Sequence, residues 1–88
     1  MKTHEYCIEG MNLTIEMDEN EDNGIRAVSY LIRALRGETG MNKTAFCAWL
    51  GIPLRTLQAW ERGEREMPDY VLRLIAYKVR MEKAAGRI

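Results

Sequence analysis

The chain has 88 residues, which is enough for one domain with one modest hydrophobic core. No apolar run approaches the ~20 residues that a membrane-spanning helix needs, and the first ten residues lack the apolar centre of a signal peptide. The two cysteines, Cys7 and Cys47, are too few for a disulfide framework. We therefore expect a cytoplasmic protein with reduced thiols and no membrane contact.

The net charge is zero at neutral pH, but the charges are unevenly distributed along the chain. Residues 1–24 contain one lysine and seven acidic residues, which gives this segment a net charge of −6. Residues 25–88 contain 12 basic and 6 acidic residues, which gives +6. We therefore divide the chain into an acidic extension, residues 1–24, and a basic domain, residues 25–88.

Apolar and polar residues alternate on both sides of Gly10, and this period of two predicts a β-hairpin over residues 3–17. An isolated hairpin is marginally stable, so its apolar face must lie on the basic domain, on a second copy or on another protein. A disordered acidic tail is the alternative. Residues 18–24 are a polar linker in which Asp22 or Asn23 is expected to cap the next helix. The predicted hairpin face consists of Tyr6, Ile8, Leu13, Ile15 and Met17.

Two longer helices are predicted at the ends of the basic domain. Residues 25–36 carry apolar side chains at helical spacing, namely Val28, Leu31, Ile32 and Leu35, and residues 37–40 form an exit turn. Residues 68–83 form the last helix, with an apolar stripe of Tyr70, Val71, Leu74, Ile75, Tyr77, Lys78 and Met81. Tyr77 and Met81 extend past a compact core, so they either finish that core or form a dimer contact.

Between these helices, residues 41–63 predict two short helices joined by a tight turn. Asn42 is placed to cap the first short helix, and Gly51 is placed to end it. Phe46, Cys47 and Leu50 form its buried stripe, with Cys47 as a small core residue. Trp49, with Ala45 and Ala48, lies off that stripe, so we expect something to pack on this face; packing of the hairpin there is the intramolecular alternative.

The second short helix starts at Pro53, which fits a first helical turn because its missing N–H costs nothing there. Leu57 and Trp60 face inward, and Gly63 ends the helix. The outward face near its N-terminus is formed by Leu54, Arg55, Thr56, Gln58 and Ala59.

Three landmarks stand at characteristic spacing: Leu50-Gly51-Ile52, Trp60-Glu61-Arg62-Gly63 and Pro68. The pattern resembles the xenobiotic-response-element (XRE) family of regulators, which has the lambda-repressor/Cro-like fold, and it covers roughly residues 25–80. The amino-acid sequence of residues 55–68 is similar to that of small repressors that serve as antitoxins. The resemblance implies a mainly α fold, a helix-turn-helix bundle of four to five helices with the short β-hairpin as an extension.

The resemblance also implies a function, a cytoplasmic repressor that binds double-stranded DNA. It would need no cofactor, act on an inverted repeat as a homodimer, and read bases with Leu54, Arg55, Thr56, Gln58 and Ala59. Arg55 suits guanine, because a guanidinium can donate to both O6 and N7. Phosphate contacts are expected from Asn42, Lys43, Arg62 and Arg65. The family often pairs a basic residue at the position of Arg36 with the glutamate after the tryptophan, here Glu61.

No enzyme is predicted, because the chain has one histidine, His4, in an expected strand, and no glycine-rich phosphate loop after a strand. One histidine and two distant thiols are also too few for a metal site. The alternative function is a protein-interaction module, an antitoxin or phage-type inhibitor that binds a protein partner such as a toxin. The expected dimer or partner surface comprises Tyr6, Ile8, Leu13, Ile15, Met17, Trp49, Tyr77 and Met81.

Overall fold

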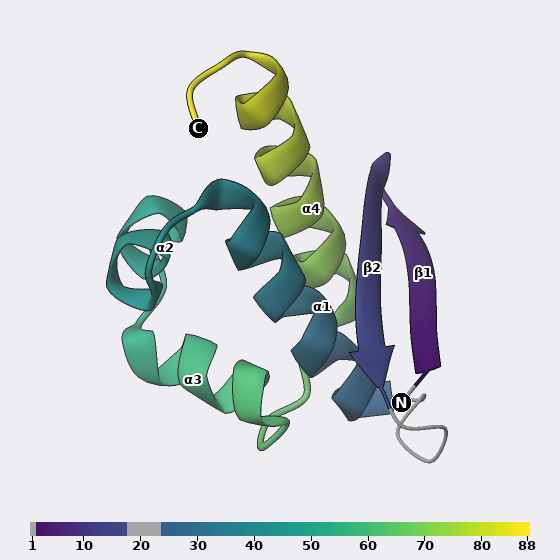
Figure 1. Ribbon diagram of the computed structural model, residues 1–88. Helices are drawn as coiled ribbons and strands as arrows, with labels where there is room; N and C mark the ends of the chain where they lie inside the picture. The colour runs from purple at the N-terminus through teal and green to yellow at the C-terminus, as the bar shows by residue number, and fades with distance from the viewer. Residues whose placement is uncertain (1, 18–23) are drawn as a thin grey trace.

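Two strands and four helices make up the computed structural model, which describes residues 2–17 and 24–88 (Figure 1). The strands are β1 (Lys2–Ile8) and β2 (Met11–Met17), and the helices are α1 (Gly24–Thr39), α2 (Lys43–Leu50), α3 (Leu54–Arg62) and α4 (Asp69–Ala84). The prediction of a mostly helical chain with an N-terminal hairpin is confirmed. The expected cap at residue 22 or 23 lies outside the described residues. None of the described helices has the length and apolar character that crossing a membrane requires.

The hairpin turn consists of two residues with positive φ, Glu9 at 49° and Gly10 at 82°. Positive φ at both central residues is what a type I′ turn requires, and that turn matches the twist of paired strands. β1 and β2 are antiparallel, with Tyr6 opposite Leu13 and Ile8 opposite Met11. Gly10 has a second constraint, because a Cβ there would lie 2.9 Å from the side chain of Arg80.

The apolar face of the hairpin is buried inside the chain. Met11, Leu13, Ile15 and Met17 of β2 are all buried, and β2 contacts α1 and α4. Tyr6 and Ile8 of β1 are half-buried at the edge of this core. Of the three possible covers for the hairpin's apolar face, the structure therefore shows the basic domain. The hairpin packs on α1 and α4, and not on the face of α2 that contains Trp49.

One prediction is corrected by this packing. Leu13, Ile15 and Met17 were expected on a dimer or partner surface, but α1 covers them, so they are not available to a partner. Met11, which the predicted face omitted, completes the buried row because it is in register with Ile8.

α1 is the central element of the fold and contacts β2, α2, α3 and α4. The hairpin lies on one side of α1 and the α2–α3 pair lies on the other (Figure 1). The largest fully buried side chains come from five of the six elements: Met17, Ile32, Leu35, Phe46, Leu57 and Val79. Each such side chain stabilises the fold by about 1.5–3 kcal/mol relative to an exposed one.

α1 is longer than predicted, because it continues through Gly37 to Thr39. The Thr39 hydroxyl donates to the carbonyl of Arg36 at 2.6 Å and accepts from the N–H of Met41 at 3.1 Å. Gly40, with φ 72°, then turns the chain. Thr39 and Gly40 therefore end the helix, and Gly37 is tolerated within it at a cost of about 1 kcal/mol relative to alanine.

The predicted core stripe of α4 is largely wrong. The buried side chains are Leu72, Ile75, Ala76 and Val79, so only Ile75 belongs to both sets. Tyr70, Leu74, Tyr77 and Met81 are exposed, by 61%, 62%, 48% and 42% respectively. The helix is apolar on two opposite faces, and the prediction followed the face with the larger side chains.

Candidate nucleic-acid interface

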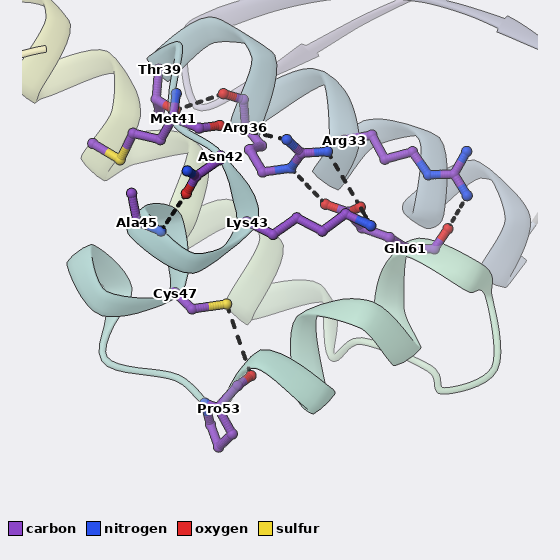
Figure 2. Close-up of polar contacts among 10 residues, drawn as sticks. All are labelled: Arg33, Arg36, Thr39, Met41, Asn42, Lys43, Ala45, Cys47, Pro53 and Glu61. Carbon is purple, nitrogen blue, oxygen red and sulfur yellow. Dashed lines mark hydrogen bonds and ion pairs between the residues drawn. The ribbon is translucent and has the colours of Figure 1, made fainter.

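α2 begins and ends at the residues that the sequence predicted. The Asn42 side-chain oxygen accepts a hydrogen bond from the N–H of Ala45 at 2.8 Å, which satisfies one donor of the first turn (Figure 2). Gly51 has φ 75° and donates its N–H to the carbonyl of Cys47 at 2.8 Å. These two caps fix the length of α2 and the direction in which the chain leaves it.

α3 follows after Ile52, which is half-buried, and Pro53. Pro53 has ψ 144° and is therefore the residue before the helix, not a member of its first turn. Leu57, Trp60 and Glu61 form the buried face of α3, and Gly63 ends the helix with φ 72°.

The predicted base-reading residues differ in exposure. Leu54 and Arg55 are exposed, whereas Thr56, Gln58 and Ala59 are half-buried. On a helix, Arg55 and Ala59 point away from the face formed by Leu57 and Trp60, and Thr56 lies closer to that face. Arg55 is thus the most freely placed hydrogen-bond donor of the set.

The predicted phosphate-binding residues lie at the ends of the two short helices. Asn42 and Lys43 are at the start of α2, and both are exposed. The cap uses the Asn42 oxygen and leaves its amide nitrogen as a donor. Arg62 is the last residue of α3 and Arg65 follows three residues later, and both are exposed. Arg62 lies 3.9 Å from the Glu64 carboxylate, and such an exposed pair contributes little.

Glu61 is 3% exposed and holds α3 to the rest of the fold (Figure 2). Its Oε2 accepts from Arg36 Nε at 2.9 Å, which is the predicted ion pair. Lys43 Nζ lies 3.7 Å from Oε1, and the Arg33 guanidinium donates to the Glu61 backbone carbonyl. Arg36 also donates to the carbonyl of Met41 at 3.5 Å, so a single side chain links α1, the chain before α2, and α3.

Two of these contacts were missed by the sequence analysis. Lys43 was expected to be free for phosphate, but its ammonium is shared with Glu61. Arg33 received no role, although it lies one turn before Arg36 on the same face of α1. That spacing is the one sequence signal that points to a joint role for the two arginines.

Cys47 lies under the turn between α2 and α3, with its Sγ 4.0 Å from the carbonyl oxygen of Pro53. Burial raises the pKa of this thiol, the Glu61 carboxylate raises it further, and Arg36 opposes both. The thiol is therefore neutral at physiological pH and acts as a small core group. No cluster of three or more potential metal ligands occurs among the described residues.

Trp49 is half-buried by its own chain, which alters its expected role. The Lys78 ammonium of α4 lies 4.4 Å from the Trp49 ring centroid and donates to the Trp49 carbonyl at 2.9 Å. The centroid of the Phe46 ring lies 6.0 Å from that of Trp49. The Lys78 side chain thus covers part of the face that was assigned to a partner, while Ala45 and Ala48 remain exposed.

Comparisons with protein-family models, with curated proteins and with solved structures gave no match to this chain. Functional conclusions therefore depend on the residues and the geometry described above.

Proposed function

We propose that this chain is a sequence-specific DNA-binding regulator in which α2 and α3 act as a helix-turn-helix and α3 enters the major groove. The observation that carries the proposal is the anchoring of α3. Its inward face is held by the buried Glu61 pair, while Arg55 projects from its outward face near the N-terminus. A reading helix needs both properties, a fixed position and a free donor.

The dimensions of α3 support this role. The helix has nine residues, and an α-helix with its side chains is about 10–12 Å across, so it fits the major groove, which is about 12 Å wide. Arg55 is the second residue of α3, which is where such helices approach base edges. Arg62 and Arg65 at one side supply donors for the flanking phosphates. Asn42 supplies them at the other side together with Lys43, whose side chain stays exposed beside Glu61.

The distribution of charge agrees with the same docking. Three carboxylates of the acidic extension, Glu5, Glu9 and Glu16, lie on the hairpin, across α1 from the α2–α3 pair (Figure 1). DNA docked on α3 would thus face the basic domain and not the hairpin. Acidic side chains close to α3 are Glu64 and Glu66, and they reduce the local positive charge.

A homodimer on an inverted repeat completes the proposal. One copy offers few base-reading donors, since Leu54 and Ala59 have none, and a two-fold pair doubles the contacts. We place the dimer contact at β1, which is paired on one side only, with β2. A second β1 strand would satisfy the unpaired backbone groups of that edge. Half-site centres would then be about 34 Å or a multiple of that apart.

Selection of bound sequences from a random duplex pool tests the proposal. Enrichment of one inverted repeat, with affinity that falls steeply with salt, is the expected result. The DNA upstream of the chain's own reading frame should compete if the protein is an autorepressor. A pool without enrichment after several rounds, from folded protein, would overturn the proposal. Light scattering on and off the selected site then gives the oligomeric state.

Protein binding is a second candidate function, and one observation favours it. Four large hydrophobic side chains lie exposed along α4, on the side of the helix that faces away from the core. An antitoxin-type regulator combines DNA binding with capture of a protein such as a toxin.

A further inference from the structure

The outer face of α4 has the spacing of a coiled-coil seam. Tyr70, Leu74, Tyr77 and Met81 are separated by four, three and four residues, which are the d-a-d-a positions of a heptad repeat. These positions lie opposite the buried face formed by Leu72, Ile75, Ala76 and Val79. α4 therefore has one seam for its own core and a second seam, here called the outer seam, that is exposed in the described part of the chain.

The outer seam contains most of the large hydrophobic side chains that are exposed in the part of the chain that the structure describes. Of the five large hydrophobic side chains exposed there, four belong to this seam, and the fifth is Leu54. Isolated exposed hydrophobic residues are ordinary, but four in one row mark a contact surface.

Hollows flank the outer seam on both sides. One, of about 420 Å³, lies between α4 and the hairpin turn and is lined by Glu9, Tyr70, Arg73, Leu74 and Tyr77. The other, of about 220 Å³, lies toward the α2–α3 turn and is lined by Leu50, Ile52, Trp60, Val71, Leu74, Ile75 and Lys78. Leu74 borders both, so it is a ridge between two grooves. Side chains of an approaching helix fit such grooves as knobs fit holes.

The charges beside the outer seam are basic. The heptad g positions within α4 are Arg73 and Arg80, and the charged e position is Lys78; Arg87 lies beyond the end of the helix. Arg80 and Lys78 donate to the backbone carbonyls of Glu9 and Trp49, at 2.8 and 2.9 Å, and neither forms an ion pair with another described residue. Arg73 with Asp69 and Arg87 with Glu82 are ion pairs with exposed arginines, and such pairs are readily exchanged.

These charges determine which occupant fits. In an antiparallel pair of outer seams, g positions face each other, so Arg73 would meet Arg80 of a second copy. In a parallel pair, Arg73 would meet Lys78 of the second copy. Both arrangements place like charges together, which disfavours self-association through this face. Tyr77 and Met81 are thus better suited to a different partner than to the homodimer contact expected from the sequence.

We propose that the outer seam of α4 binds an acidic amphipathic helix of another protein, with apolar residues at a and d and Asp or Glu at e and g. Over the 11 steps from Tyr70 to Met81 the seam is about 16 Å long, so two heptads of partner helix cover it. Arg55 lines neither hollow, so an occupied outer seam leaves it free for DNA.

A synthetic peptide of about three heptads, with Leu at a and d and Glu at e and g, is the probe. Mutual repulsion of its glutamates keeps it from self-pairing at neutral pH. One control peptide carries Lys in place of Glu, and a second keeps the acidic composition but scrambles the heptad. Fluorescence anisotropy of the labelled peptides on the full chain should show binding of the acidic peptide at least about tenfold tighter than either control.

Four variants decide between the occupants. Leu74→Glu should weaken binding of the acidic peptide by about tenfold or more, and Tyr77→Glu is a second test at another exposed position of the seam. Ala48→Glu adds the same charge at an exposed position of α2 and should change nothing. Arg73→Glu with Arg80→Glu should reverse the preference toward the lysine peptide.

Equal binding of the acidic, lysine and scrambled peptides would overturn the proposal, and so would unchanged binding by Leu74→Glu. A chain that self-associates and becomes monomeric on Leu74→Glu would show that the occupant is a second copy, which also overturns it. Binding of Leu74→Glu to the selected DNA is measured in parallel, so failure of this inference is distinguishable from failure of the proposed DNA binding.

Discussion

α3 and α4 each bury one face against α1, but their outer faces differ in chemistry. The outer face of α3 carries Arg55 and Arg62, whereas that of α4 carries tyrosine, leucine and methionine. A polar outer face matches hydrated base edges and phosphates, and an apolar outer face matches another apolar surface. Two helices on one small scaffold are therefore suited to two classes of partner.

The two helices are also fixed in different ways. α3 depends on a buried ion pair, Arg36 with Glu61, in addition to Leu57 and Trp60. α4 is held by apolar burial alone on its inner face, and its polar contacts, such as Lys78 with the Trp49 carbonyl, lie at the rim. Substitutions in each helix should thus have effects of different size and kind.

The largest effect is expected from Glu61→Ala. It removes the carboxylate that pairs with Arg36 and Lys43 and leaves a partly buried guanidinium without its partner. The free energy of unfolding should fall by about 3 kcal/mol in urea titrations. Glu64→Ala, in an exposed pair with Arg62, is the matched control and should change stability by less than about 0.5 kcal/mol. Equal losses in the two variants would mean that α3 is not anchored by this pair.

The second prediction compares the two faces of α4. Val79→Ala creates a cavity in the core and should cost about 2.5 kcal/mol, whereas Leu74→Ala on the outer seam should cost less than about 0.5 kcal/mol. Thermal unfolding of both variants at low protein concentration is the measurement. A large loss for Leu74→Ala would show that the outer seam is covered by the chain itself in solution.

The third prediction concerns the outer face of α3. Arg55→Ala should cost about 2 kcal/mol at one base pair of each half-site and little at other positions. Lys43→Ala should weaken binding to all sequences alike and reduce the salt slope by about one. Lys2→Ala, on the hairpin, is the control for loss of one charge. If both Arg55→Ala and Lys43→Ala bind the selected site as tightly as the parent chain, α3 is not docked as proposed.

The boundaries of α2 and α3 could be predicted because their signals are local. Asn42, Gly51 and Gly63 each act on the backbone within a few residues, whatever the rest of the chain does. The pairing of Arg36 with Glu61 was expected from family resemblance, and the structure contains it. The contact of the Lys43 ammonium with the Glu61 carboxylate depends on how α2 and α3 pack against each other, which no local sequence pattern specifies.

The inner face of α4 and the position of the hairpin could not be predicted, for related reasons. Periodicity locates an apolar face but does not show which of two such faces on one helix is buried. In α4 the buried face contains Ala76 and Val79, whereas Leu74 and Tyr77 are exposed. The hairpin pattern predicted two strands with one apolar face. It did not show that α1 would cover that face, because α1 is apolar on more than one side.

A smaller effect is expected at the hairpin turn, which borders the outer seam. Glu9 has φ 49°, a conformation that asparagine adopts more readily than glutamate. Glu9→Asn should therefore raise the free energy of unfolding by about 0.5 kcal/mol, while the backbone carbonyl that accepts from Arg80 is retained. Hydrogen exchange of the hairpin amides measures the change. Faster exchange in the variant would contradict the turn geometry.

The smallest effect is a pH dependence at the junction of α2 and α3. Burial raises the pKa of the Cys47 thiol above its ordinary value, so in the folded chain the thiol stays protonated when that of the unfolded chain has begun to ionise. The unfolded state then binds fewer protons, and stability falls as the pH rises past about 8.5, the usual range of a cysteine. Cys47→Ala should remove this part of the alkaline loss, whereas Cys7→Ala, at an exposed thiol, should leave it in place. Urea titrations at several pH values between neutral and alkaline measure the difference, and identical slopes for the two variants would show that the Cys47 thiol is open to solvent.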